Sequence, residues 1–158
     1  MTNNEDKLRG LLKRIDAAWE AFSQSYAGLP ESELLVAGVT GDWSVRDILA
    51  HVTTWEKEAL KYLPLIFSGG VPPRYATYGG IDAFNAQMAE QERGLSLSDV
   101  RRQLDETHGR LIDVIRSAPG DYLTSETRFR RRLRLDTYGH YSQHAEAIRE
   151  WRQKRSAG

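Results

Sequence analysis

The feature that most constrains this chain is a helical repeat of apolar residues that recurs in four long segments. In the first of them, apolar side chains stand three or four positions apart, at Leu8, Leu11, Leu12, Ile15, Trp19, Phe22 and Tyr26. This spacing predicts helices over about residues 4–27, 44–67, 98–116 and 136–154. No segment shows a convincing alternation typical of strands. We therefore expect an all-α protein built as a four-helix bundle.

A long loop and a short extra helix are expected between the second and third long helices. Residues 68–80 are rich in glycine and proline and show no periodicity, which is unusual for a connection in a compact domain. A short helical pattern follows over residues 82–92. With 158 residues, the whole chain 1–158 is expected to form one domain.

Composition excludes several classes of chemistry. The chain has no cysteine, so a disulfide scaffold, a zinc–thiolate site and a cysteine nucleophile are ruled out. The longest apolar runs are far shorter than the ~18 residues that would indicate a membrane span, and the first residues are polar and acidic. We expect no membrane partner and a cytoplasmic location.

The net charge of zero conceals an uneven distribution. Residues 1–100 carry 9 basic and 14 acidic side chains (9 − 14 = −5), whereas residues 101–158 carry 13 and 8 (13 − 8 = +5). The densest basic run is Arg128, Arg130, Arg131, Arg132 and Arg134. It fits either a nucleic-acid or phosphate patch, or a solvated segment or strand-like turn leading into the last helix. Since no nucleic-acid-binding motif accompanies it, we do not expect a nucleic-acid partner.

The histidines carry the strongest chemical signal. His140 and His144 are four residues apart in a helical segment, so both rings project from one face and can converge on one ion. His51 faces the expected core on the second long helix and is the candidate third ligand; the alternative is a histidine that simply packs in the core. His108 could be a fourth ligand or a half-buried histidine at the bundle edge. Unperturbed imidazoles would lose metal affinity below about pH 6.5.

Two carboxylates stand one helical turn before these candidates. Asp47 precedes His51 and Asp136 precedes His140, so each could hold the ring of its histidine by a hydrogen bond. The alternative is that both are ordinary acids in the first turn of a helix, where the helix dipole favours them. Asp47 also follows Ser44 by three residues, which predicts a capping box at the start of the second long helix.

The sequence resembles the DinB-like superfamily of metal-binding four-helix bundles, which includes mycothiol-dependent maleylpyruvate isomerases and bacillithiol transferases. The resemblance rests on WSVRDILAH at 43–51, Trp55-Glu56 and His140-x-x-x-His144. Within the superfamily, YGGIDAFN at 78–85 and the segment 136–151 are similar to the ClbS/DfsB branch. The resemblance implies that His51, His140 and His144 surround a divalent ion, commonly zinc or nickel. For the branch, it implies self-protection by hydrolytic opening of a reactive electrophile.

These observations give one enzymatic hypothesis. A metal-dependent hydrolase, or a transferase that uses a low-molecular-weight thiol, would act on a small reactive or toxic molecule, with the ion activating water or the thiol. The pocket for this small-molecule substrate would be shaped by Trp55, Tyr75, Tyr78, Asn85 and Tyr141. Each of these side chains has an alternative role in core or loop packing.

The alternative hypothesis is a binding or stress-response bundle without catalytic activity. In that case the ion is structural or absent, and the histidines belong to the core. The resemblance to the superfamily also makes a homodimer plausible, but the sequence does not place an interface.

Overall fold

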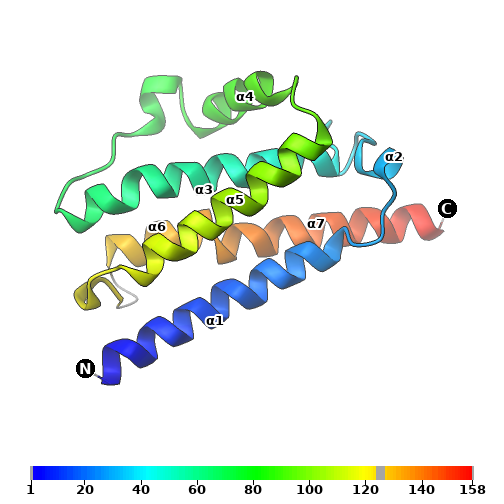
Figure 1. The fold of residues 1–158 in the computed structure, drawn as a ribbon. Helices are drawn as coiled ribbons and strands as arrows, with labels where there is room; N and C mark the ends of the chain where they lie inside the picture. Colours follow the sequence, from blue (N-terminus) through cyan, green and yellow to red (C-terminus); the bar gives the residue numbers. More distant parts are fainter. Residues whose placement is uncertain (1, 124–126, 158) are drawn as a thin grey trace.

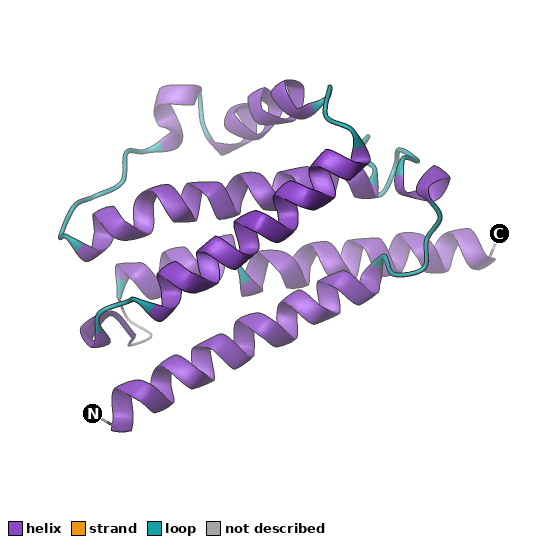
Figure 2. Cartoon of the chain, viewed as in Figure 1, coloured by secondary structure: helices purple, strands orange, loops and turns teal. Residues whose placement is uncertain are grey.

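A computed structural model describes residues 2–123 and 127–157 of the chain. Within these residues the chain is helical with no strand (Figure 2), apart from one isolated bridge between Thr40 and Trp43. The elements are α1 (Thr2–Ser25), α2 (Glu31–Leu34), α3 (Val45–Phe67), η1 (Tyr75–Tyr78), α4 (Ile81–Glu92), α5 (Leu97–Arg116), η2 (Gly120–Leu123), α6 (Arg128–Asp136) and α7 (Tyr138–Ala157). The predicted all-α class is confirmed.

The long helices form two pairs that pack into a bundle (Figure 1). α1 runs alongside α7, and α3 packs against α5. α6 contacts both α3 and α7, while α4 lies against α3 on the outside of the bundle. The extra helix predicted between the second and third long helices is therefore present as α4, while the predicted loop over residues 68–80 contains the short helix η1. This arrangement places α3 and α7 next to each other, with α4 and α6 at their sides.

One apolar core joins the helices. Most of the periodic residues predicted to face inward are buried on the long helices, and others, such as Leu8, Leu12 and Trp19, are partly buried against the core. The fully buried side chains include Leu11, Ile15, Phe22, Ile48, Leu49, Leu63, Leu111, Ile115, Phe129, Leu133 and Tyr141. The orientation of each helix, and hence of its polar side chains, follows from burying this stripe.

The start of α3 is set by the predicted capping box. The Ser44 hydroxyl accepts a hydrogen bond from the Asp47 amide at 3.2 Å, and the Asp47 carboxylate accepts one from the Ser44 amide at 2.9 Å. Two amides that the first turn would leave without partners are thereby satisfied. The cap fixes where the helix begins, and so places His51 in its second turn.

The basic run is helical, which corrects the expectation of a solvated segment or strand-like turn. Phe129 and Leu133, four residues apart, are fully buried and anchor α6, and the Thr127 hydroxyl accepts a hydrogen bond from the Arg130 amide. The arginines obscured this short apolar stripe in the sequence. The last long helix accordingly starts at Tyr138 rather than at residue 136, after a break at Thr137.

Glycines shape two junctions near the site. A Cβ on Gly139 would lie 2.7 Å from the Arg134 carbonyl oxygen, so the close contact between the ends of α6 and α7 requires glycine. Gly79 and Gly80 have φ values of 94° and 108°, which L side chains rarely adopt. They turn the chain from η1 into α4 and so bring both elements over α3.

Candidate metal centre and adjoining pocket

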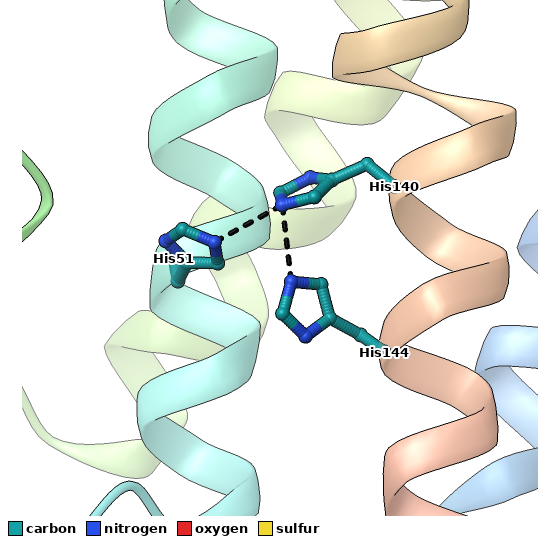
Figure 3. A group of neighbouring side chains, drawn as sticks. All are labelled: His51, His140 and His144. Carbon is teal, nitrogen blue, oxygen red and sulfur yellow. Dashed lines mark hydrogen bonds between the residues drawn. The ribbon is translucent and has the colours of Figure 1, made fainter. Parts of the chain in front are cut away.

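Three histidines from two helices converge in the interior of the bundle. His51 projects from α3, and His140 and His144 project from α7 (Figure 3). The Nε2 atom of His140 lies 3.0 Å from Nε2 of His51 and 3.0 Å from Nε2 of His144. One ligand atom from each ring lies within 4.8 Å of the others. We call this group the histidine triad.

Burial keeps the imidazoles of the triad neutral. Desolvation, with a smaller contribution from the neighbouring imidazoles, lowers the pKa of His51 to about 3 and that of His140 to about 2. Desolvation lowers the pKa of His144 to about 4. Neutral imidazole is the form that binds a metal ion. The decline of metal affinity expected below pH 6.5 from unperturbed values should therefore begin nearer pH 4.

The three rings do not satisfy one another's hydrogen-bonding groups. A neutral imidazole has one N–H donor and one acceptor nitrogen. His140 Nε2 is shared between two neighbours, while His140 Nδ1 is buried and has no partner. Two nitrogens bound to one zinc ion lie roughly 3.3 Å apart, close to the 3.0 Å contacts seen here. The donor set therefore fits a divalent transition-metal ion.

A pocket of about 380 Å³ opens onto the triad. Its volume lies in the range of small-molecule sites. Trp55 of α3 and Asn85 of α4 line it and are joined by a hydrogen bond from Trp55 Nε1 to Asn85 Oδ1 of 2.9 Å. Tyr75 of η1 also lines it, with its ring against Trp55. Three of the five residues predicted to shape a pocket thus lie in its wall.

The other two predicted pocket residues lie elsewhere. The ring of Tyr78 packs against Tyr75 and Phe84, and the residue is 39% exposed. Tyr141 is fully buried among the core residues, because it follows His140 by one position and so points to a different face of α7. Neither side chain belongs to the pocket lining. The structure therefore gives both tyrosines the packing role that was their alternative.

Arg132 is a pocket residue that the sequence did not single out. Its guanidinium donates from Nη2 to the Tyr75 hydroxyl at 2.8 Å and pairs through Nε with Asp136 Oδ2 at 2.5 Å. The Tyr75 hydroxyl in turn donates to Glu58 at 3.2 Å. In the sequence, Arg132 was one of five arginines in a run, and only the register of α6 directs it inward.

Asp136 lines the pocket but is paired with Arg132 rather than with a histidine. Burial raises the pKa of Asp136 to about 7, and the Arg132 guanidinium opposes that rise. Since α6 ends at Asp136, this residue is not a first-turn acid. Asp47 uses both carboxylate oxygens elsewhere, one in the capping box and one on Arg46 at 3.0 Å. The first-turn role is thus the one that the structure gives to Asp47.

His108 belongs to a separate buried cluster. Glu56 of α3 has a side chain that is 0% exposed, and its Oε2 lies 2.7 Å from His108 Nδ1. The same Oε2 accepts a hydrogen bond of 2.6 Å from the Tyr141 hydroxyl. The His108 ring stacks on Trp19, with centroids 3.6 Å apart and planes at 6°. We call Glu56, His108 and Tyr141 the glutamate cluster; its histidine is engaged away from the triad.

The fold and the site define a helical bundle in which three histidines from two helices face a pocket. A family model of the DinB superfamily matches residues 14–148, and the chain belongs to that superfamily. The resemblance read from the tryptophan-to-histidine segment and the histidine pair is therefore confirmed at the level of the superfamily. No curated protein matches the chain.

A solved structure has the same fold. It is titled "Sibling Lethal Factor Precursor - DfsB", and the two chains superpose with a TM-score of 0.74 at 15% sequence identity. The match covers 96% of this chain and 96% of that one. At this identity the likeness establishes a shared fold over nearly the whole length. No helix among the described residues is long and apolar enough to cross a membrane.

Proposed function

We propose that this protein is a metal-dependent enzyme that acts on a small reactive molecule, with His51, His140 and His144 holding a divalent ion. Its reaction would be a hydrolysis or the transfer of a low-molecular-weight thiol. The observation that carries the proposal is the convergence of three neutral imidazoles at a pocket of about 380 Å³. Membership of the DinB superfamily, whose members commonly bind metals, and the fold shared with DfsB support it.

An ion held by three imidazoles has room for a further ligand and acts as a Lewis acid that lowers the pKa of a bound water or thiol. The protein's own residues would supply binding and orientation. Arg132 and the Tyr75 hydroxyl, 2.8 Å apart, present polar hydrogens and oxygen to the pocket. Trp55 offers an aromatic wall, and its hydrogen bond fixes Asn85 so that the amide nitrogen of Asn85 stays free to donate.

Asp136 would serve as a proton carrier in this pocket. Burial raises its pKa to about 7, so the carboxyl exchanges a proton near neutral pH. The ion pair with Arg132 holds the carboxyl in the pocket wall. When Asp136 is ionised, the pair balances the charge of Arg132; when Asp136 takes up a proton, the guanidinium charge is left unbalanced.

The test is the metal content per chain of protein purified without a histidine tag. We expect about one zinc or nickel ion per chain in the wild type and little in His51→Ala. His108→Ala is the matched control, because it removes a buried histidine outside the triad, and it should keep its ion. Absence of metal from the wild type, or equal loss in both variants, would contradict the proposal.

Turnover separates an enzyme from a binding module. Metal-loaded and metal-free protein should be compared on activated esters, for hydrolysis, and on an epoxide with added thiol, for transfer. Turnover that requires both the ion and Asp136 supports the enzyme. A fully loaded protein without turnover in either assay favours a bundle in which the ion is structural.

A further inference from the structure

Two exposed apolar side chains stand at the mouth of the pocket. Ile81, the first residue of α4, is 55% exposed, and Leu135, near the end of α6, is 67% exposed. Both belong to the lining of the pocket that holds the histidine triad. Single exposed apolar residues are common, but here two helices from different parts of the chain each place one at the same opening. We call Ile81 and Leu135 the apolar rim.

The core does not account for the apolar rim. On α6 the buried positions are Phe129, Leu133 and Asp136, and Leu135 lies off that stripe. On α4 the side chain that is buried is Phe84, one turn after Ile81. Because both rim residues leave more than half of their surface in water, they contribute little to the stability of the fold. Their apolar character is therefore available to a ligand.

The pocket changes character from its mouth to its floor. The mouth carries the apolar rim, whereas the interior holds the triad and the pair formed by Arg132 and Asp136. The carboxyl of Asp136 already occupies the guanidinium of Arg132, so the interior favours a polar group rather than an anion in particular. A ligand that matches both ends has a compact polar head and an apolar arm.

We propose that the site takes an amphipathic small molecule whose polar, reactive head reaches the triad and whose alkyl or acyl arm lies between Ile81 and Leu135. The chemistry at the head rests on the proposed function, but the binding of the arm depends on protein side chains alone. A second copy of the chain is a poorer occupant. A stable protein interface buries ~800 Å² on each partner, far more than two side chains at the mouth of a hollow provide.

The proposed binding of the arm is tested with metal-binding probes that differ only in the length of their alkyl chain. Acetohydroxamate and octanohydroxamate share one head that chelates zinc, so the ratio of their dissociation constants on zinc-loaded protein reports the arm. Six additional methylene groups, about half buried, should make octanohydroxamate about 50-fold tighter by titration calorimetry. A ratio near one in the wild type would overturn the proposal.

A variant of the apolar rim and a matched control show whether the effect of chain length on affinity arises at the rim. Ile81→Gln/Leu135→Gln should reduce the ratio to about threefold and leave the affinity for acetohydroxamate unchanged. Leu35→Gln/Val71→Gln is the control, because Leu35 is 50% and Val71 68% exposed but neither lines the pocket. The control should keep the wild-type ratio. An equal ratio in the rim variant and the wild type would show that the arm binds elsewhere or not at all.

Two further measurements, of metal content and of oligomeric state, distinguish a failure of the proposed function from a failure of the rim proposal. Metal content is measured on the same samples; if none binds, the proposed function fails, and the rim is tested on the metal-free protein by NMR with 1-octanol against 1-butanol. Saturable shifts by octanol in the wild type and not in the rim variant would support the rim. Light scattering gives the oligomeric state, and loss of a dimer in the rim variant with an unchanged chain-length ratio would assign the rim to an interface between copies instead.

Discussion

The bundle contains two buried groups built around histidine, and they differ in whether the imidazole nitrogens find partners within the chain. The glutamate cluster pairs His108 with a carboxylate and a hydroxyl, and its ring stacks on Trp19. The histidine triad contains three imidazoles that contact one another, with one buried nitrogen left without a partner. The first group gives its histidine partners from within the chain, whereas the second presents three ring nitrogens that fit a divalent ion.

Both groups use side chains of α3 and α7, and the glutamate cluster adds His108 from α5. α3 contributes His51 to one and Glu56 to the other, while α7 contributes the adjacent residues His140 and Tyr141. A difference of one position on α7 therefore separates a side chain facing the pocket from one buried in the core. Residue type alone does not make a histidine a ligand; its neighbours decide whether it has a partner within the chain.

Zinc addition should produce the largest difference between the two groups. At a free concentration 1,000 times the dissociation constant, zinc should raise the free energy of unfolding of the metal-free wild type by about 4 kcal/mol. His140→Ala/His144→Ala should show no such gain, because its triad is lost. Urea denaturation with and without zinc measures both. Equal stabilisation of the variant would place the ion outside the triad.

Removing the carboxylate of the glutamate cluster should reduce the stability of the fold without changing metal binding. Glu56→Ala leaves His108 and the Tyr141 hydroxyl without their buried partner, and we expect a loss of about 3 kcal/mol in the free energy of unfolding. Zinc content should remain that of the wild type. The control is Glu150→Ala, at an exposed position on α7. A loss of metal in Glu56→Ala would show that the two groups are coupled.

Acid should destabilise the metal-free triad. Because burial lowers the pKa of His51 to about 3, the unfolded chain takes up a proton below pH 6.5 and the folded chain does not. The stability that this neutral ring contributes is fully present above pH 6.5 and is lost as the pH falls toward 3.

When the pH falls from 7 to 5, the free energy of unfolding of the metal-free wild type should therefore decrease by up to about 2 kcal/mol more than that of His51→Asn. Urea denaturation in the presence of a chelator measures the two curves, and groups outside the triad affect both alike. Curves that run parallel across this range would mean that the His51 ring is hydrated in the folded protein.

The smallest effects are expected from replacing the two tryptophans that pack against His108 and His51. Trp19 stacks on His108, and Trp43 packs against His51 with ring centroids 4.7 Å apart. Trp19→Leu and Trp43→Leu should each reduce stability by about 1 kcal/mol. Only Trp43→Leu should weaken zinc binding, by about threefold, because only Trp43 steadies a ring of the triad. Zinc titration of both variants provides the test, and an equal change in affinity would contradict the separation of the two groups.

Some features of the site were predictable because they are local. The capping box joins Ser44 and Asp47, three positions apart, and its geometry depends only on one turn of helix. The placement of His140 and His144 on one face follows from helical periodicity for the same reason. The four long helices and α4 followed from the apolar repeat. α6 did not, because five arginines concealed a stripe of only two apolar residues, and neither did the short α2, η1 and η2.

Other features depended on how the helices pack. His51 lies 89 positions from His140, and Arg132 lies 57 positions from Tyr75, so no spacing in the sequence relates them. The inward direction of Arg132 and the engagement of His108 by Glu56 likewise follow from the rotation of one helix against another. The pair formed by Arg132 and Asp136 is local, four residues apart on α6, but it was missed because that helix was not recognised. The sequence by itself determined the helices and the residues that each face carries. Only the tertiary structure decided which faces meet, because burial of the shared apolar core sets the orientation of every helix at once.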